Sequence, residues 1–428
     1  MSFHKICVLG LGYIGLPTAS TFATHGMEVV GVDVNEQVVT SLQHGQLHIY
    51  ELGLQTLVEE ALQSGRLKIS RQPEAADAFI IAVPTPFYDD KRADMRAVAS
   101  ATEAIVPHLR RGNLVVLEST SPPRTTLDLV APILERSGLK AGVDFHLAYS
   151  PERVLPGQIL RELIENARVI GGVDAASAEA GRELYQTFVR GEIILTTSTT
   201  AEMVKLMENT YRDVNIAVAN EFARLADRFG VDVWEAISIA NLHPRVNILR
   251  PGPGVGGHCI SVDPWFLVEA APDLTQVIRS ARVVNDAQPH FVLGLVRQAL
   301  GTELKGRRVA LLGLSFKPDV DDLRESPAIE LGHLLAKEGA EVRAFEPFKP
   351  DAEVPGLTTC TSLEQAVADA EAVLLLVGHA ELKRLSPQTL AALTPARVAL
   401  DATGSWAPEA WAAAGFTLLR LGVGSRSA

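Results

Sequence analysis

The residues best suited to covalent chemistry lie in a short loop that ends in a cysteine. Residues 251–259 have the sequence Pro-Gly-Pro-Gly-Val-Gly-Gly-His-Cys, and Asp263 follows four residues later. Glycines let the backbone approach a ligand closely, and a thiolate at the end of such a loop can attack a carbonyl carbon. A lone cysteine is more often a small buried apolar residue. The loop therefore leaves both roles open for Cys259, whereas Cys7, in an apolar strand, and Cys360 are expected to have no chemical role.

A second group of polar residues lies on one face of a long predicted helix. Between Thr199 and Phe229 apolar residues recur at helical spacing, and Thr199 with Glu202 matches a capping box. The pattern predicts one helix of roughly 30 residues, about 45 Å long, which bridges two domains and supplies a dimer surface. Lys205 and Asn209 are one turn apart on this helix. Their spacing fits a solvated polar stripe as well as it fits a functional site.

A glycine motif near the N-terminus predicts a dinucleotide site. Gly10, Gly12 and Gly15 form G-x-G-x-x-G, with Tyr13 and Ile14 inside it, after a strand and before a helix. The glycines permit a tight turn and close approach of a pyrophosphate, which the helix N-terminus attracts. Asp33 ends the next predicted strand, where a carboxylate accepts hydrogen bonds from ribose hydroxyls and repels a 2′-phosphate. The predicted cofactor is therefore NAD rather than NADP.

Alternating strand and helix patterns predict an α/β fold. We expect two Rossmann-like domains with parallel sheets, joined by the long central helix and a helical domain. The predicted limits are 1–198 for the NAD-binding domain, 199–300 for the helical dimerisation domain with the cysteine loop, and 301–428 for the second α/β domain. The second α/β domain has only Gly313 at the matching turn, so we expect it to bind something other than a dinucleotide. The predicted strands are 6–9, 28–32, 78–83, 114–117, 145–149, 308–312, 341–345, 372–377 and 398–402; helices are predicted at 17–25 and over 263–299.

The composition narrows the class of protein. The chain has 428 residues, 47% of them hydrophobic, and a formal net charge of -12. This charge argues against binding to nucleic acid or to an anionic membrane, since both require a cationic surface. Three irregularly spaced cysteines predict neither disulfides nor a metal site. With no apolar run of membrane-spanning length and no signal peptide pattern, we expect a cytoplasmic, multi-domain enzyme.

Taken together, these motifs resemble the UDP-glucose/GDP-mannose dehydrogenase family over essentially the whole chain. The segments that carry the resemblance are 10–15, 83–86 (Val-Pro-Thr-Pro), 118–120 (Glu-Ser-Thr), 150–153 (Ser-Pro-Glu-Arg), Lys205 with Asn209, 256–259 with Asp263, and 316–317 with 324–326.

The resemblance implies a four-electron oxidation of a sugar C6 alcohol by NAD through a thioester on Cys259. Lys205 and Asn209 are then suited to stabilise charge on the reacting oxygen. Glu152 is a candidate base for thioester hydrolysis and Thr120 orients the water, while Asp263 orders water or accepts a proton. The resemblance leaves open which of Glu152 and Asp263 performs which of these roles.

The resemblance also implies the binding residues. Pro84, Thr85, Thr120 and Arg324 are expected to contact NAD, in addition to the glycine motif and Asp33. The expected contacts to the UDP-sugar come from Glu152, Arg153, Lys205, Asn209, Gly256 and Lys317. Arg245 is expected to reach the substrate of a second subunit, which implies a homodimer.

The sequence is compatible with more than one substrate. Segments 243–248, 254–259 and 262–266 most resemble the branch that oxidises UDP-N-acetyl-D-mannosamine, since Ile260, Ser261 and Val262 depart from the Gly-Gly-x-Cys-Leu-Pro-Lys-Asp pattern of the UDP-glucose branch. UDP-glucose and UDP-N-acetylglucosamine are the alternatives. A two-electron dehydrogenase of hydroxy acids or acyl-CoA, and a non-catalytic protein that binds nucleotide sugars, are hypotheses of other classes.

Overall fold

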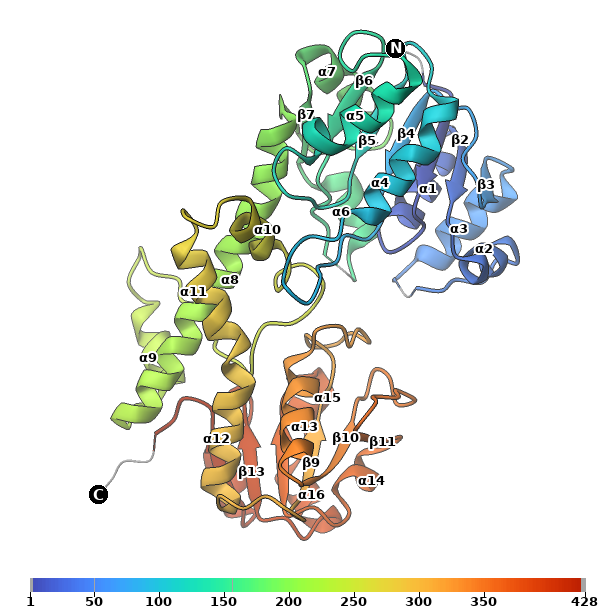
Figure 1. Ribbon diagram of the computed structural model, residues 1–428. Coiled ribbons are helices and arrows are strands. Elements are labelled where there is room, and N and C mark those ends of the chain that lie inside the picture. Colours follow the sequence, from blue (N-terminus) through green and yellow to red (C-terminus); the bar gives the residue numbers. More distant parts are fainter. Residues whose placement is uncertain (1–2, 50, 156, 425–428) are drawn as a thin grey trace. The chain divides into compact units, whose positions relative to one another are not determined.

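The computed structural model describes residues 3–49, 51–155 and 157–424. It separates into two units, one formed by residues 1–208 with 265–272 and the other by residues 209–264 with 273–428. The division falls inside the long helix, after Glu208. Each unit contains one sheet covered by helices (Figure 1).

The first unit is built on an eight-stranded sheet of order β3-β2-β1-β4-β5-β6-β7-β8. Its strands are β1 Lys5–Leu9, β2 Glu28–Val32, β3 Leu67–Ser70, β4 Ala78–Ile81, β5 Leu114–Leu117, β6 His146–Tyr149, β7 Arg168–Gly172 and β8 Ile193–Thr197. The predicted strands in this half are confirmed, apart from small differences at their ends. β3, β7 and β8 are additional; every residue of β8 is at least partly exposed, so it carries no buried apolar run.

Two strands, β7 and β8, correct the expectation of a fully parallel sheet, since β8 pairs parallel with the reversed β7. β7 runs antiparallel to β6, with Ala148 opposite Gly172. The connection between them contains the short helix α6, Ile159–Glu165, which Glu51 holds by accepting hydrogen bonds from the backbone N–H groups of Gly157 (2.7 Å) and Ile159 (3.0 Å). Because this connection does not cross back over the sheet, β7 begins at the edge where β6 ends.

Alternating residues of the central strands pack into two cores, one on each face of the sheet. Ile6 and Val8 belong to one buried cluster, and Cys7 and Leu9 belong to the other. Cys7 is fully buried, as expected for a packing residue. The helices of this unit are α1 Gly15–Thr24, α2 Glu36–Gln43, α3 Leu54–Gln63, α4 Arg96–Ile105, α5 Ala131–Leu134, α6 and α7 Ala175–Tyr185, with short 3-10 or π turns at Val106–His108, Thr126–Val130 and Glu135–Ser137.

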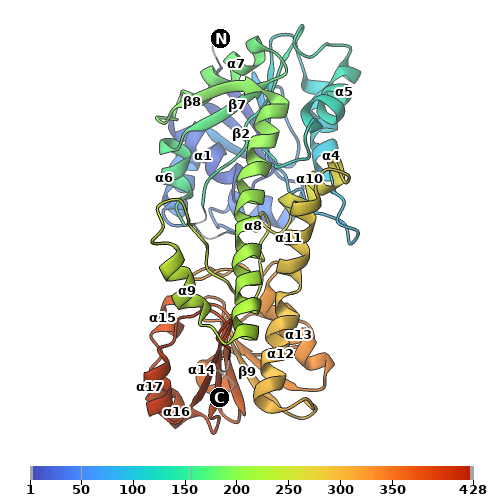
Figure 2. The same cartoon turned by 90° about the vertical axis from the view of Figure 1, so that its left-hand side faces the viewer.

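The long helix is confirmed, but its predicted cap is wrong. α8 covers Ser198–Phe229, 32 residues, and is continuous (Figure 2). The cap is Thr197, whose Oγ1 accepts a hydrogen bond from the N–H of Thr200 at 3.2 Å. Glu202 does not turn back to the helix start; its buried carboxylate binds the N–H and hydroxyl of Thr126 at 2.8 and 2.6 Å. A long-range partner therefore replaces the local one.

The helical region predicted at 263–299 consists of three helices. These are α10 Asp263–Ala270, α11 Gln276–Asp286 and α12 Gln288–Leu300, while α9, Val233–Ala240, follows α8. Pro272 lies in the first break and Pro289 lies in the first turn of α12, which fits the tendency of proline to end or begin helices.

The second unit contains a six-stranded, fully parallel sheet of order β11-β10-β9-β12-β13-β14. Its strands are β9 Arg308–Leu312, β10 Glu341–Phe345, β11 Thr358–Cys360, β12 Ala372–Leu375, β13 Val398–Asp401 and β14 Thr417–Arg420; its helices are α13 Pro327–Lys337, α14 Leu363–Val367, α15 Ala380–Lys383, α16 Pro387–Leu393 and α17 Pro408–Ala413. The order matches β3-β2-β1-β4-β5-β6, so the two Rossmann-like sheets are confirmed. Cys360 is the last residue of β11 and is buried.

Candidate active site

The glycine motif forms the turn between β1 and α1, as the sequence predicts. Gly10 has φ +93°, and a Cβ there would lie 2.4 Å from the carbonyl oxygen of Ala82. A Cβ at Gly15 would lie 1.8 Å from the carbonyl oxygen of Gly10. Gly12 differs, because a Cβ there would meet no atom within 4 Å among the described residues. Gly10 and Gly15 are thus required by packing, whereas Gly12 borders open space at the start of α1, where a pyrophosphate fits.

The remaining predicted NAD residues follow neighbouring strands at the same edge of the sheet. The Asp33 carboxylate, after β2, accepts hydrogen bonds from the N–H groups of Leu11 (3.0 Å) and Asn35 (2.9 Å). Pro84 and Thr85 follow β4, and Thr120 follows β5. The carboxyl edge of such a sheet is where this fold binds dinucleotides. These residues therefore fit NAD.

His48 is a further residue at this edge, and no sequence motif predicts it. It lies beside Asp33 and the backbone of Leu11; burial lowers the pKa of its imidazole, and the Asp33 carboxylate opposes that shift. A single histidine in a loop carries no sequence signal, so only the fold reveals its place beside the cofactor residues.

Glu152 lies in the loop after β6 and is firmly held. Its Oε1 accepts hydrogen bonds from the N–H groups of Arg153 (2.7 Å) and Val154 (3.1 Å), and its Oε2 lies 2.7 Å from Nη2 of Arg168. The guanidinium of Arg153 pairs with Glu208 of α8 at 2.6 Å and donates to the carbonyl of Ala167. These contacts therefore fix the orientation of the Glu152 carboxylate. The ion pair of Arg153 with Glu208 attaches the loop to α8.

The central helix carries the next two candidates. Lys205 and Asn209 are half-buried and one helical turn apart on α8. The amide Nδ2 of Asn209 donates to Oδ2 of the buried Asp263 at 2.5 Å. The structure thus brings Asn209 and Asp263 into contact, although 54 positions separate them in the chain. An Asp263 carboxylate oriented in this way is suited to order water or accept a proton.

Cys259 is exposed at the turn that leads into α10. Its carbonyl oxygen accepts hydrogen bonds from the N–H groups of Val262 (3.0 Å) and Asp263 (2.8 Å). This position resolves the sequence ambiguity over packing, since Cys259, unlike Cys7 and Cys360, is not a core residue.

The glycine-rich loop before Cys259 is anchored along its length. Gly252 donates its N–H to Oδ1 of Asn220 on α8 and accepts from Nε2 of Gln288 on α12, both at 2.9 Å. Gly257 has φ +86° and donates its N–H to the carbonyl of Arg324 at 3.1 Å. A Cβ at Gly256 would lie 2.3 Å from the carbonyl oxygen of Glu325. The glycines therefore let the loop pack directly against backbone.

The other predicted substrate and cofactor residues of the second unit lie on loops. Lys317 is half-buried, with Nζ 5.6 Å from the ring centroid of Phe316, and the exposed Arg324 forms an ion pair with Asp322 at 2.6 Å. Arg245 is exposed after α9. Burial lowers the pKa of His258, and Arg324 lowers it further, so this histidine is neutral beside Cys259 at neutral pH.

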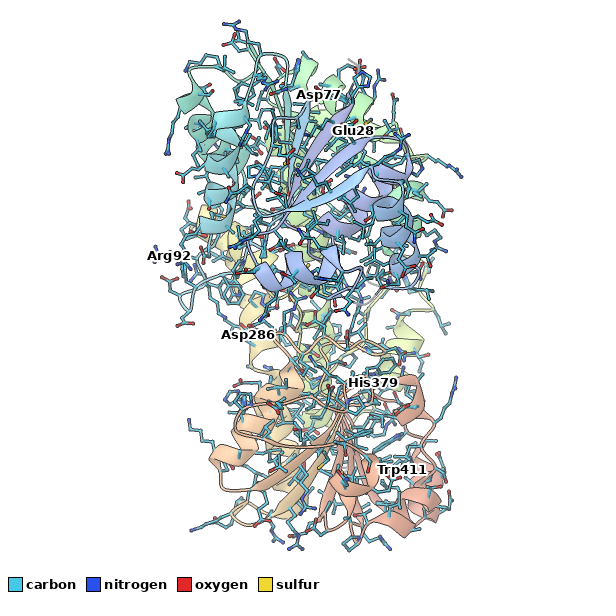
Figure 3. All side chains as sticks on the ribbon, turned by 90° about the vertical axis from the view of Figure 1, so that its right-hand side faces the viewer. Glu28, Asp77, Arg92, Asp286, His379 and Trp411 are labelled. Atoms are coloured by element: carbon cyan, nitrogen blue, oxygen red, sulfur yellow. The ribbon has the colours of Figure 1, made fainter. Side chains whose placement is uncertain are left out.

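The second sheet has a carboxylate at the position that corresponds to Asp33. Glu346 follows β10 as Asp33 follows β2, and its Oε2 accepts from the N–H of Leu314 at 2.7 Å. Unlike Asp33, it is buried, and it contacts Nε2 of the fully buried His379 at 3.2 Å. His379 and the buried Trp411 are labelled in Figure 3. The Glu346 carboxylate is thus engaged by buried groups of the protein, whereas a carboxylate at this position in a dinucleotide site would bind a ribose.

Substitution of Gly257 by alanine is expected to lower kcat/KM by about 10²-fold, because a displacement of about 1 Å has an effect of this size. A Cβ there would lie 2.7 Å from the Phe316 ring, at a φ that disfavours any side chain. Gly252→Ala is the matched control, since its Cβ would meet no described atom within 4 Å. Steady-state kinetics of both variants tests the prediction, and equal activities would contradict it.

Comparisons with known proteins agree with this arrangement. Three models of the UDP-glucose/GDP-mannose dehydrogenase family match: the NAD binding domain at residues 4–189, the central domain at 199–287 and the UDP binding domain at 310–408. The chain belongs to this family. As a UDP-glucose/GDP-mannose dehydrogenase family member it is an NAD-dependent UDP-sugar dehydrogenase, which confirms the predicted enzyme class and cofactor.

Individual family members are similar along almost their whole length. The UDP-N-acetyl-D-mannosamine dehydrogenase of Methanocaldococcus jannaschii is 46% identical, over 99% of this chain and 97% of that protein. The NDP-N-acetyl-D-galactosaminuronic acid dehydrogenase of Ralstonia solanacearum is 48% identical, over 96% and 99%. Among solved structures, the UDP-D-ManNAc dehydrogenase of Pyrococcus horikoshii matches with a TM-score of 0.91 at 40% identity, over 98% and 99%. Within the described ranges, every helix is too short or too polar to span a lipid bilayer.

Proposed function

We propose that this dehydrogenase oxidises C6 of UDP-N-acetyl-D-mannosamine to the uronic acid, through a thioester on Cys259. The observation that carries the proposal is the exposed Cys259 in the turn before α10, four residues before an Asp263 held by Asn209. An N-acetylated sugar is favoured because the relatives from Methanocaldococcus jannaschii and Ralstonia solanacearum are both named for one.

The domains divide the work of binding. We assign NAD to residues 1–198, with Gly10, Gly12, Gly15 and Asp33 as its principal contacts, and the nucleotide sugar to residues 199–300 and 301–428. When bound, NAD+ accepts one hydride in each of two oxidations, so that one alcohol, two NAD+ and one water give one carboxylate, two NADH and three protons. Because NAD and nucleotide sugars are metabolites of the cytoplasm, we place the reaction there.

The oxidation steps use groups of the central helix and the cysteine loop. In the first oxidation, C6 loses a hydride and its hydroxyl loses a proton, which leaves an aldehyde. The Cys259 thiolate then adds to the aldehyde carbon, and Lys205 and Asn209 stabilise the charge that develops on the oxygen. Loss of a second hydride from C6 converts the thiohemiacetal into a thioester. The covalent bond keeps the reactive aldehyde on the enzyme between the two oxidations.

Hydrolysis of the thioester needs a base and an ordered water. We assign the base to Glu152, because its carboxylate is fixed by two backbone N–H groups and by Arg168. Thr120 orients the water. As water attacks the thioester carbon, its proton passes to Glu152, the carbon–sulfur bond breaks, and the Cys259 thiolate leaves. Asp263 is the alternative base, since it too has a fixed orientation.

The substrate assignment is tested by NADH yield with four sugars: UDP-N-acetylmannosamine, UDP-N-acetylglucosamine, UDP-N-acetylgalactosamine and UDP-glucose. We expect two NADH per sugar and the highest kcat/KM with UDP-N-acetylmannosamine. One NADH per substrate would refute the four-electron reaction. A higher kcat/KM with another of these sugars would refute the proposed substrate.

We also propose a homodimer formed through α8. Apolar residues that recur at helical spacing on α8 are exposed within this chain: Met207, Tyr211, Val218, Phe222, Leu225 and Phe229. An exposed apolar stripe of this kind is typical of a protein interface. In a dimer, Arg245 is assigned to the substrate of the second subunit.

Phe229→Asp is expected to dissociate the dimer and to lower activity at least tenfold, because it places a charge in the apolar contact. Phe229 is 72% exposed within one chain. Val143→Asp is the control, as Val143 is 82% exposed but is not part of the stripe. Sedimentation velocity and kinetics check both variants. A fully active monomer of the unmodified protein would contradict the proposal.

A further inference from the structure

A buried charged cluster lies behind Glu152 in the first unit. It is formed by Glu118, Arg168 and Tyr185, with Ser150 at its side. We propose that Arg168 and Glu118 are positioning residues for the hydrolysis step: Arg168 holds and orients Glu152, and Glu118 competes for the same guanidinium and so sets how strong a base Glu152 is. This inference rests on the proposed role of Glu152.

Arg168 contacts both carboxylates at once. Its Nη2 lies 2.7 Å from Oε2 of Glu152, and its Nη1 lies 3.2 Å from Oε1 of Glu118 and 2.9 Å from Oγ of Ser150. Its Cζ lies 4.2 Å from the ring centroid of Tyr185. Only 5% of its side chain is exposed. Such a buried, forked guanidinium holds its partners in one geometry, which a lysine ammonium does not reproduce.

The reversed strand explains how this cation reaches the site. Glu118 comes directly after β5, and Glu152 comes shortly after β6, so both lie at the carboxyl edge of the sheet. In a parallel strand, the first residue would lie at the opposite edge. Because β7 is antiparallel to β6, its first residue, Arg168, begins at the carboxyl edge. The antiparallel direction of β7 thus places the Arg168 guanidinium next to the two carboxylates.

Of the two carboxylates, Glu118 has the longer contact with Arg168, at 3.2 Å compared with 2.7 Å for Glu152. Its Oε1 also accepts a hydrogen bond from the Tyr185 hydroxyl at 2.5 Å, while its buried Oε2 makes no hydrogen bond to the described residues. Burial raises the pKa of Glu118 to about 7; Arg168 opposes this shift and the charge of Glu152 adds to it. Burial therefore favours the neutral form of Glu118, which ionises only at a pH above the usual range for a glutamate.

The charge of Glu118 changes what Glu152 experiences. While Glu118 is neutral, Glu152 is the only charged partner of Arg168 in this cluster. The positive charge of Arg168 then stabilises the ionised form of Glu152 and makes it a weaker base. Once Glu118 ionises, it shares the guanidinium and adds a negative charge nearby, and both effects strengthen Glu152 as a base. The guanidinium of the neighbouring Arg153 is engaged by Glu208. Thioester hydrolysis is therefore expected to accelerate as pH rises through the ionisation of Glu118.

The experiment separates hydrolysis from oxidation in a single turnover of the complete enzyme with UDP-N-acetylmannosamine and NAD+. NADH absorbance follows the oxidations, and intact-protein mass follows the adduct on Cys259. Arg168→Lys is expected to slow decay of the adduct by 10- to 100-fold while the rate of the first NADH and KM change less than threefold. Equal slowing of both stages would overturn the proposal, because it would mean that Arg168 is merely structural.

Two further variants test the role of Glu118 in opposite directions. Glu118→Gln removes the ionisation, so the rise in hydrolysis rate near pH 7 is expected to disappear. Tyr185→Phe removes a hydrogen bond that stabilises ionised Glu118, so the same rise is expected to move to higher pH with an unchanged plateau. Profiles identical to that of the unmodified enzyme would overturn the proposal.

Glu152→Gln distinguishes this inference from the function on which it rests. If Glu152→Gln leaves hydrolysis unchanged, the proposed base is wrong and the inference falls with it. If Glu152→Gln blocks hydrolysis but the Arg168 and Glu118 variants do not alter it, the base is right and the positioning roles are wrong.

Discussion

Replacement of Cys259 by serine is expected to lower the rate of uronic acid formation by about three orders of magnitude or more. A serine hydroxyl is far less acidic and less nucleophilic than a thiol, so the variant lacks a nucleophile of comparable strength. The loss falls on the second oxidation, which needs the covalent adduct. Oxidation of the alcohol to the aldehyde does not require the thiolate and is expected to persist.

Two substrates at different oxidation levels separate these stages. With the alcohol, Cys259→Ser is expected to yield at most one NADH per sugar; with the C6 aldehyde, it is expected to yield almost none. Intact-protein mass should detect an adduct on the unmodified enzyme and none on the variant. Cys360→Ala is the matched control, because Cys360 is a buried cysteine of the same unit, and it should retain the yield of two NADH. Unchanged acid production by Cys259→Ser would exclude the covalent scheme.

Gly12→Ala is expected to weaken NAD binding by about 10²-fold while the free energy of unfolding changes by less than about 0.5 kcal/mol. The folded protein has room for the added methyl group, since no described atom lies within 4 Å of its position. That room is the space at the start of α1 which a pyrophosphate would occupy, and close approach of backbone is what a glycine permits there.

Gly15→Ala provides the contrast within the same motif. Its Cβ would lie 1.8 Å from the carbonyl oxygen of Gly10, which is backbone and cannot turn away. We expect it to destabilise the fold by about 3 kcal/mol or more, in the range of severe overpacking. Calorimetric titration with NAD+ and urea unfolding measure the two effects. Unchanged NAD affinity in Gly12→Ala would contradict the placement of the cofactor.

Features that depend on a short stretch of chain could be predicted from the sequence. The motif at residues 10–15, the apolar runs that became β1, β9 and β10, and the helical repeat of α8 are all local patterns. Each pattern depends on residues that are close together in the chain, so the spacing of apolar residues and glycines is enough to predict the element. The family resemblance rested on motifs of the same kind, and the matches to all three family models agree with it.

Features that depend on distant partners could not be predicted. Glu202 fits a local capping box equally well, but Thr126, 76 positions away, takes its carboxylate. The spacing of Asn209 on its helix fits a solvated residue equally well, and only its contact with Asp263 distinguishes it. The strand β8 lacks a buried face, and the direction of β7 follows from the path of a connection rather than from its own residues.

The sequence by itself determined the chemical groups available to this protein: a dinucleotide turn, an acidic residue for the ribose, and one cysteine in a loop of glycines. Tertiary structure alone decided how those groups are tuned. It exposed Cys259 in the turn before α10 and buried Cys7 and Cys360. It also brought Arg168 between Glu118 and Glu152. The reason is physical: burial, ion pairing and hydrogen bonding are set by residues that meet only after the chain has folded.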